Sequence, residues 1–321
     1  DMTFACIGAV DAMHNTLDWA ARGGENRNRI GIVVFADNAK YDLGSSGEYT
    51  QGAGGGAILI RHNPRLLAIP DIWGVSTMPV HDFFKPRREI ETRTVVENVL
   101  ELAEESGARI TSNLAEKILR MLPRSKKKNH VIFENEKIMI HKDTPVFDGQ
   151  FSNRCYSESV KQAFIDFRRK AIDEGRYEPD SDEILTNQWS RIIVHLPYAF
   201  QGKRMFPDVF RHDRRNLPMW SKIVEEIGPE PLPSDYPDTL DGIEEFEKAN
   251  DSYRRLISKT DEFQVFVHER IEKTQRASSL IGNQYTGSIF LALMSSMESD
   301  YLEDVEIESN RIGLCGYGSG A

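Results

Sequence analysis

The sequence has 321 residues, of which 28% are charged and 40% hydrophobic, and its formal net charge is -10 at pH 7. This length exceeds the size at which a single core usually stops growing, so we expect two halves or two domains. The acidic balance disfavours general nucleic-acid binders and proteins of anionic membranes, because both need a basic surface. No apolar run approaches the ~20 residues of a membrane-spanning helix. Three widely spaced cysteines do not form a disulfide framework, so we expect a protein of the reducing cytoplasm.

The first residues predict a cysteine at the start of a helix. Apolar side chains at positions 7, 10, 13, 17 and 20 recur at helical spacing directly after Cys6. Unpaired N–H groups and the positive end of the helix dipole favour a thiolate there, so Cys6 is a candidate nucleophile. The alternative is a buried, inert thiol that packs as a small hydrophobic side chain. Because the sequence opens on Asp1 in the middle of this pattern, we expect a fragment that lacks an N-terminal portion.

Two strands are predicted after this helix. Residues 30–36 form a continuous apolar run of strand length, which is typical of a strand buried on both faces. Asp37 to Tyr41 follow at its carboxyl end, where open α/β sheets often place groups that contact a ligand. A glycine-rich loop that contains Thr50 then leads into a second apolar strand. Its glycines suit either a flexible turn or a close approach of the backbone to a ligand.

The segment from about 87 to 143 predicts an excursion from the main body. Two helices are predicted, over 92–107 and, with Asn113 as its N-cap, over 114–122. A basic run, Lys126-Lys127-Lys128, and a hairpin over 131–140 follow. We expect a surface insertion, because surface loops tolerate long insertions. The alternative is that the three lysines reshape the entrance of a binding site for a phosphate-bearing ligand.

The second half of the chain carries two further candidates for chemistry. The run 192–198 predicts a strand that ends in His195, although a histidine in such a place is more often structural than catalytic. The charged segment 239–274 predicts helices that cover the outside of the protein. Residues 280–293 predict a turn into an apolar helix, with Asn283 at its start.

Cys6, His195 and Asn283 are far apart in the sequence, but their side chains suit one reaction. Condensing two acyl groups needs a nucleophile to carry one of them and a histidine that acts as an acid and hydrogen-bond donor. It also needs fixed dipoles that hold a carbonyl oxygen while charge develops on it. We therefore interpret these three residues as catalytic candidates, and we expect no metal site.

The order of the short motifs resembles that of the hydroxymethylglutaryl-CoA synthase family. The motifs are Ala5-Cys6, Asp37 to Tyr41, Thr50 to Gly54, Asp82 to Pro86, Pro145 to Gly149, Ser152 with Cys155-Tyr156, His195 to Tyr198, Gly282 to Thr286, and Tyr317 to Ala321. They extend over nearly the whole chain apart from residues 87–143. Each motif is weak alone, but nine motifs in one order are specific.

This resemblance implies an α/β protein with a thiolase-like fold, in which two similar halves layer mixed sheets between helices. Residues 1–61 would be the remainder of the N-terminal half, and residues 62–321 would be the C-terminal half with the excursion inserted. The implied activity is that of an acyltransferase. Acetyl-CoA acylates Cys6, the bound acetyl group loses a methyl proton, and the carbanion adds to the ketone of acetoacetyl-CoA. Water then releases 3-hydroxy-3-methylglutaryl-CoA.

Several properties of the whole protein are also implied by the resemblance. We expect a homodimer in the mevalonate route to isoprenoids, with no cofactor besides the CoA thioesters that are its substrates. We expect no nucleic-acid partner and no membrane. The family's general base is a glutamate upstream of the nucleophile, outside the given sequence. The chain alone is therefore expected to be catalytically impaired.

Residue roles are carried over by motif position. Cys6 is the acyl-bearing nucleophile, His195 holds and protonates the acetoacetyl carbonyl, and Asn283 orients the acyl substrate. Contacts with substrate and CoA are expected from Asp37, Tyr41, Thr50, Asp82, Ser152, Lys203, Tyr285 and Ser319. Lys203 fits the basic contact with a CoA phosphate, whereas Phe200 stands where the family often has a lysine.

Three alternatives remain open at this stage. A polyketide β-branching synthase of the same family would take its acyl groups from carrier proteins. An ordinary thiolase would match Cys315 in its glycine-rich loop, but it would have a Gly-His-Pro context, whereas His195 is followed by Leu196. The third alternative is a non-catalytic protein or interaction module with a thiolase fold. Intact Cys6, His195 and Asn283 argue against it.

Overall fold

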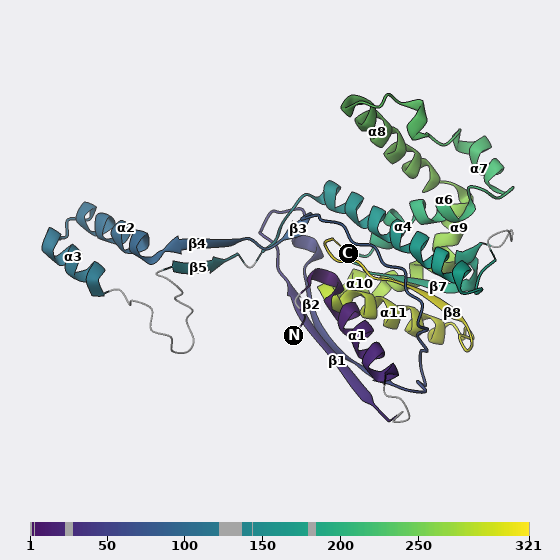
Figure 1. Ribbon diagram of the computed structural model, residues 1–321, viewed down its shortest axis with the longest axis horizontal. Coiled ribbons are helices and arrows are strands. Elements are labelled where there is room, and N and C mark those ends of the chain that lie inside the picture. Colours follow the sequence, from purple (N-terminus) through teal and green to yellow (C-terminus); the bar gives the residue numbers. More distant parts are fainter. Residues whose placement is uncertain are drawn as a thin grey trace. The chain divides into compact units, whose positions relative to one another are not determined.

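The computed structural model describes residues 2, 4–22, 28–121, 137–142, 144–178 and 184–320. The chain forms two compact units (Figure 1). Unit 1 comprises Asp1–Phe83 with Phe147–Ala321, and unit 2 comprises Phe84–Val146. The excursion expected over about 87–143 falls inside unit 2, and every candidate site residue lies in unit 1. A division of unit 1 into two similar halves near residue 61 stays a prediction.

Unit 1 begins with the helix start that the sequence predicts at the cysteine. Cys6 lies in the short 3-10 helix η1 (Ala5–Ile7), which continues directly into α1 (Gly8–Ala21). The predicted apolar stripe of α1 is the face that packs, with Met13 buried against Val33 and Ile60. Figure 1 shows α1 alongside the strands that carry these two residues.

Those strands form a two-stranded antiparallel sheet. β1 (Ile30–Ala39) pairs with β2 (Gly52–Arg61) without interruption, from Ile30 opposite Arg61 to Ala39 opposite Gly52. The loop between them contains the 3-10 helix η2 (Glu48–Thr50). This pairing brings the end of β1, where Asp37 and its neighbours lie, next to the start of β2.

Only one face of the β1–β2 sheet is buried among the described residues. On the other face the exposed fractions of Ile32, Val34 and Leu59 are 64%, 74% and 61%. The prediction of a strand buried on both faces is therefore wrong for β1. Adjacent side chains of a strand point to opposite faces of the sheet. A strand that is apolar on both faces is buried on both only where other elements pack against each face.

The second sheet of unit 1 is parallel and fully buried in its middle. β7 (Trp189–Val194) pairs with β8 (Arg311–Cys315), and Ile192 and Ile193 are 0% exposed. The long helix α4 (Gly149–Asp173) starts at Asp148, whose carboxylate accepts the first free N–H groups of the helix. Tyr156, Val160 and Phe164 of α4 belong to the same core cluster as β7.

The remaining helices of unit 1 follow β7 in sequence, apart from η3, which precedes it. They are η3 (Leu185–Gln188), α5 (Gln201–Met205), α6 (Pro207–Arg214), α7 (Trp220–Ile227), η4 (Pro233–Asp235), α8 (Leu240–Ile257), α9 (Asp261–Arg270), η5 (Glu272–Thr274), α10 (Gln275–Ile281), η6 (Tyr285–Gly287) and α11 (Ser288–Leu302). No described helix is both long and apolar enough to cross a membrane. Helices with antiparallel and parallel strand pairs confirm the expected α/β class.

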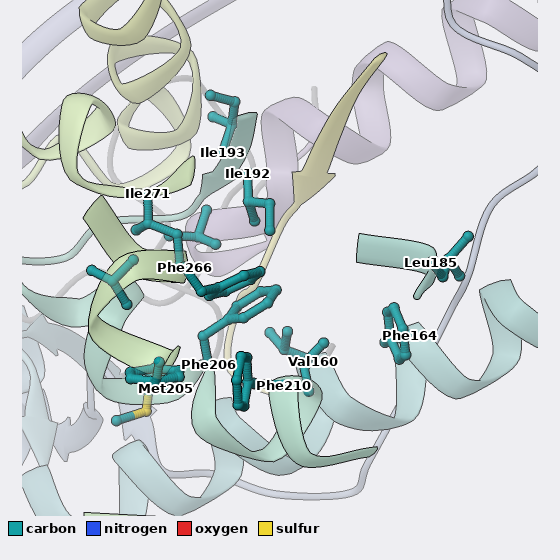
Figure 2. Close-up of a cluster of buried hydrophobic side chains, with 14 of the residues drawn as sticks. Val160, Phe164, Leu185, Ile192, Ile193, Met205, Phe206, Phe210, Phe266 and Ile271 are labelled. Atoms are coloured by element: carbon teal, nitrogen blue, oxygen red, sulfur yellow. The ribbon is translucent and has the colours of Figure 1, made fainter. Parts of the chain in front are cut away.

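Aromatic side chains fill the centre of this core. Figure 2 shows Phe206 and Phe266 stacked together close to Phe210, and the centroids of the first two rings are 5.6 Å apart. Phe266 belongs to α9, where Phe263 is also buried, at 1% exposed. Within the segment 239–274 that is expected to cover the outside, α9 therefore also contributes to the core, while Asp261, His268 and Glu269 are exposed.

Unit 2, described by itself, consists of an antiparallel strand pair and two helices. β4 (Arg87–Glu91) pairs with β5 (Lys137–His141), and α2 (Thr92–Glu105) and α3 (Ser112–Met121) lie between them in sequence. Both predicted helices are thus present. The boundary with unit 1 falls within two short strands, β3 (Phe83–Phe84) and β6 (Val146–Phe147).

Two details of unit 2 differ from the sequence-based expectations. The Thr111 hydroxyl accepts the Leu114 N–H at 3.3 Å, so Thr111 caps α3 instead of Asn113. The second arm of the hairpin expected over 131–140 is β5, which pairs with β4. The first arm of that hairpin, and Lys126 to Lys128, lie outside the described residues.

Candidate active site

Cys6 lies beside a small aromatic cluster at the junction of η1 and α1. Ala39, Tyr41 and Tyr285 are the buried members of the cluster, and Cys6, Phe83 and Phe147 pack against them. Ala39 is the last residue of β1, Tyr41 follows two residues later, and η6 supplies Tyr285. The structure thus brings the predicted segment after β1 to the cysteine.

The surroundings of Cys6 stabilise its neutral thiol. Burial raises the pKa of Cys6 well above its ordinary value, and the negative charges of Asp37 and Asp82 raise it further. The expectation that the helix start favours a thiolate is therefore wrong for this structure. Loss of hydration and two nearby carboxylates outweigh the dipole of a helix start. Cys6 is protonated at neutral pH, so its reaction as a nucleophile requires removal of the thiol proton.

Asn283 is buried, and its side-chain amide is held on both sides. The Nδ2 group donates to the Tyr41 hydroxyl at 3.2 Å. The Oδ1 atom accepts the Tyr285 N–H at 2.8 Å and the Ser288 hydroxyl at 3.1 Å. The backbone N–H of Asn283 donates to the Thr50 carbonyl at 2.9 Å. These bonds fix the amide dipole and join the loop before β2 to the Cys6 cluster.

Two glycines explain how these segments approach each other. Gly282 has φ +85°, and a Cβ there would collide with the Gln51 carbonyl oxygen. A Cβ on Gly52 would lie 2.6 Å from the backbone oxygen of Asn283. Of the two interpretations of the glycine-rich loop, the structure shows close backbone approach, although the neighbour is the protein's own chain. Tyr285 also has a positive φ of 44°, which is unusual for a bulky residue and common at functional sites.

Asp82 is the centre of a second hydrogen-bonded group near the cysteine. Its carboxylate is buried and accepts the hydroxyls of Ser152 at 2.8 Å, Tyr317 at 2.9 Å and Ser319 at 2.5 Å. Three residues predicted separately from the sequence, Asp82, Ser152 and Ser319, therefore form one cluster. Tyr317 was not predicted individually, although it opens the last of the nine motifs.

His195 lies directly after β7 and is almost fully buried. The backbone N–H of His195 donates to the Cys315 carbonyl at 3.0 Å, and the backbone carbonyl of His195 accepts the Tyr156 hydroxyl at 2.8 Å. The imidazole is 1% exposed, and its Nδ1 atom has no hydrogen-bond partner among the described residues. Burial lowers the pKa of His195 to about 3, so the ring is neutral at neutral pH. A buried polar atom without a partner is costly, and a ligand or water can satisfy it.

Tyr156 lies between His195, the hydrogen-bonded group around Asp82 and the surroundings of Cys6. Its ring centroid is 4.3 Å from that of Tyr317, which binds Asp82. Burial raises the pKa of Tyr156 well above its ordinary value, and the proximity of Cys315 and Cys6 adds to this effect. In the sequence Tyr156 is only one member of a motif with Ser152 and Cys155, and its role follows from tertiary contacts that no sequence pattern indicates.

Three predicted residues make more peripheral contacts. The carboxylate of Asp37 accepts the N–H and the hydroxyl of Thr286, at 3.2 and 2.5 Å. The Thr50 hydroxyl donates to the Gly47 carbonyl at 2.7 Å and also forms a hydrogen bond with the Tyr41 side chain. Lys203 is exposed on α5, with Nζ 4.8 Å from the ring centroid of Phe200.

Among the described residues, no group of three or more His, Cys, Asp and Glu side chains could hold a metal ion.

The known proteins that are similar to this chain are hydroxymethylglutaryl-CoA synthases. The family model described as hydroxymethylglutaryl-coenzyme A synthase C terminal matches residues 130–321. The hydroxymethylglutaryl-CoA synthase of Haloferax volcanii is 26% identical over 318 residues, covering 99% of this chain and 56% of that protein. The Schizosaccharomyces pombe synthase is 24% identical over 330 residues, which cover 100% of this chain and 56% of that protein. The chain thus spans about half the length of the curated relatives it matches.

Solved structures show the same fold. MvaS in complex with 3-hydroxy-3-methylglutaryl coenzyme A aligns with a TM-score of 0.57 and 22% identity, over 94% of this chain and 52% of that one. A synthase complexed with CoA aligns with a TM-score of 0.54 and 20% identity, over 100% of this chain and 53% of that one. The expected thiolase-like fold is thereby confirmed. Because the family model covers more than half of the residues, this chain belongs to the hydroxymethylglutaryl-CoA synthase family.

Proposed function

We propose that the protein carrying this chain condenses acetyl-CoA with acetoacetyl-CoA to give 3-hydroxy-3-methylglutaryl-CoA and CoA, through an acetyl-Cys6 intermediate. The observation that carries the proposal is the gathering of Asp37, Tyr41 and Asn283 around a cysteine at a helix start. Family membership supports the same reaction. No cofactor and no metal ion take part in this proposal.

In the first step, the Cys6 sulfur attacks the thioester carbonyl of acetyl-CoA. A new S–C bond forms, the bond to the CoA sulfur breaks, and the thiol proton leaves with CoA as its free thiol. Burial disfavours charged groups, and both the Cys6 thiol before this step and the acetyl thioester after it are uncharged. Asn283 can hold the acetyl group with its amide dipole, since Tyr41 and Tyr285 prevent the amide from turning.

In the second step, a base removes a methyl proton from the acetyl group, and the resulting carbanion attacks the ketone carbon of acetoacetyl-CoA. We assign the base to no residue of this chain. The neutral His195 can donate one N–H hydrogen bond to the ketone oxygen as negative charge develops there. Its transfer of a full proton requires that bound substrate raise the low pKa of the ring. Water finally cleaves the thioester to Cys6 and leaves a carboxylate.

Several finer features belong to the same proposal. Lys203 is exposed, with Phe200 against its side chain, and we assign to it a contact with a phosphate of CoA. Homodimer formation, a cytoplasmic location and a place in isoprenoid synthesis through mevalonate are carried over from the family resemblance. One relative, from Cricetulus griseus, is described as cytoplasmic.

The test is mass spectrometry of the Cys6 peptide in the complete polypeptide that carries this chain. Incubation with acetyl-CoA should add one acetyl group to Cys6, and acetoacetyl-CoA should then remove it with formation of the product. A Cys155→Ser variant should behave like the unchanged protein, whereas Cys6→Ser should form no thioester. Acetylation only by an acetylated carrier protein would support the polyketide β-branching alternative. No adduct from either donor would refute both enzymatic functions.

A further inference from the structure

Gln201 has a buried side-chain oxygen without a partner. It is the first residue of α5 and is 2% exposed. Its Nε2 group donates to the Asn153 Oδ1 atom at 3.1 Å, but its Oε1 atom accepts no hydrogen bond from the part of the chain that the structure describes. An amide oxygen can accept two hydrogen bonds, and leaving a buried one unpaired costs free energy. A ligand or a water molecule that donates to this oxygen removes that cost.

The chain at Gln201 packs against the segment that carries His195. A Cβ on the next residue, Gly202, would lie 2.8 Å from a side-chain atom of Val194 and 3.6 Å from one of Leu196. These two residues directly precede and follow His195 in the sequence. The first turn of α5 is therefore close to the end of β7.

Asn153, which carries the other amide, lies on the part of α4 that contacts the candidate site. Its neighbour Ser152 donates to the Asp82 carboxylate at 2.8 Å. Tyr156, three residues further along the same side of the helix, donates to the backbone carbonyl of His195 at 2.8 Å. The pair of amides thus joins α4 to α5 at residues adjacent to the buried groups of the site.

The two side chains together present one free acceptor and one free donor. Gln201 Oε1 is the acceptor, and the donor is the Asn153 Nδ2 group, which makes no hydrogen bond with any described residue. A secondary amide has one N–H and one carbonyl oxygen, so it can pair with both side chains at once. A phosphate or a carboxylate has no N–H for Gln201, and an ammonium group has no acceptor for Asn153. The pair therefore suits an amide better than an ion.

The surroundings of the pair change from buried to exposed along the sequence. His195 is 1% exposed, whereas Phe200 is 57% exposed and Lys203 is also exposed. In the proposed function, His195 meets the reacting end of a thioester substrate and Lys203 meets a phosphate of CoA. The phosphopantetheine arm joins these two parts of CoA, and it contains secondary amides. Gln201 lies between the two contacts in the sequence.

We propose that Gln201 and Asn153 bind a secondary amide of the phosphopantetheine arm. The amide N–H donates to Gln201 Oε1, and the Asn153 Nδ2 group donates to the amide carbonyl. This inference rests on the proposed function, because it takes His195 and Lys203 as contacts of the two ends of the arm. Neither amide residue belongs to the nine motifs of the sequence. Their contact would favour substrates with the arm over short thioesters that lack an amide, since those leave the buried oxygen unpaired.

The first test measures binding of phosphopantetheine by titration calorimetry, with the complete polypeptide that carries this chain. Gln201→Met, which keeps a similar size, should weaken binding about 3–10-fold, because one hydrogen bond is lost. The matched control is Gln275→Met on α10. Gln275 is also buried, at 6% exposed, and its Nε2 group has no partner among the described residues. Equal weakening in both variants, unchanged binding in Gln201→Met, or no binding by the unchanged protein would overturn the proposal.

A second test changes the ligand and leaves the protein intact. Each amide N–H of phosphopantetheine is replaced in turn by an ester oxygen, which keeps the carbonyl. One of these analogues should bind the unchanged protein about 3–10-fold more weakly than phosphopantetheine, and this difference should vanish in Gln201→Met. Asn153→Asp should weaken binding of phosphopantetheine and of that analogue alike, because aspartate has no N–H for the carbonyl. If every analogue binds like phosphopantetheine, the oxygen of Gln201 is paired with water and the proposal is wrong. Both tests measure binding, so they and the acetylation test of Cys6 can fail independently.

Discussion

Each sheet of unit 1 has a strand with an apolar run, but the two runs have different surroundings. The run covers residues 30–36 of β1 and residues 192–194 of β7, and a candidate site residue follows each, Asp37 in one case and His195 in the other. In β7 the middle residues Ile192 and Ile193 are 0% exposed. In β1 every second side chain is exposed, including Val34 at 74%. The comparison teaches that an apolar run identifies a strand but does not determine how many of its faces are covered.

The largest expected effect is on the rate of product formation and comes from His195 at the end of β7. His195→Asn should lower the rate of product formation by about 10²–10⁴-fold, because the ketone oxygen loses its donor. Acetylation of Cys6 should continue, since that step does not use the histidine. Rates of product release and the acetyl adduct, measured side by side, check this. A loss of both steps would show that His195 supports the fold and not only the second step.

The second difference is in stability. Ile193→Ala in β7 should lower the free energy of unfolding by about 2–5 kcal/mol, because it leaves a cavity in a core that cannot collapse fully. Val34→Ala on the open face of β1 should change it by less than about 0.5 kcal/mol. Urea unfolding of both variants measures the contrast. An equally large loss for Val34→Ala would mean that the outer face of β1 is covered in solution.

The third difference is a dependence on pH that comes from β7. The pKa of His195 is lowered to about 3 in the folded state, against an ordinary value of 6.5. The unfolded chain therefore binds the proton first as the pH falls, so stability is full above pH 6.5 and declines towards pH 3. The decline should be about 1.4 kcal/mol per pH unit from this group.

Unfolding of the unchanged chain and of His195→Gln at several pH values tests this dependence. The comparison uses the slope between pH 6 and pH 4.5, because the substitution also changes packing at every pH. His212 serves as an internal reference, since burial also lowers its pKa, to about 4, in both proteins. Identical slopes would show that His195 is not neutral and buried in solution.

The smallest expected effect is at the end of β1. The negative charge of Asp37 raises the pKa of the Cys6 thiol, after the larger effect of burial. Asp37→Asn should lower that pKa and speed alkylation of Cys6 by iodoacetamide at pH 8, by about 3–10-fold. Asp11→Asn, which removes a charge from α1, is the matched control. A slower reaction in Asp37→Asn than in the control would contradict the charge effect assigned to Asp37.

Much of the local structure was predictable because it depends on neighbours in the sequence. The helix start at Cys6, the strand that ends at Ala39 and the two helices of unit 2 all follow from the pattern of apolar residues. The motif order also selected the residues that the structure brings together, such as Asn283 with Tyr41. Short-range patterns carry this information since helices and strands form from contacts a few residues apart.

The electrostatic state of the site was decided by tertiary structure. The sequence indicated a helix start at Cys6, and the dipole argument from that feature alone favoured a thiolate. Folding instead removes much of the hydration of Cys6 and places Asp37 and Asp82 near it, so the neutral thiol is favoured. Desolvation depends on everything that packs around a group, and sequence spacing gives no measure of it.

The sequence by itself determined the elements, the order of the motifs and the identity of the candidate residues. Tertiary structure alone decided that Asp82, Ser152 and Ser319 share one hydrogen-bonded cluster and that β1 keeps an open face while β7 is enclosed. It also decided that α9, within a strongly charged segment, contributes Phe263 to the core. The physical reason is that burial results from contacts between segments far apart in the chain, whereas periodicity records only which residues share a face.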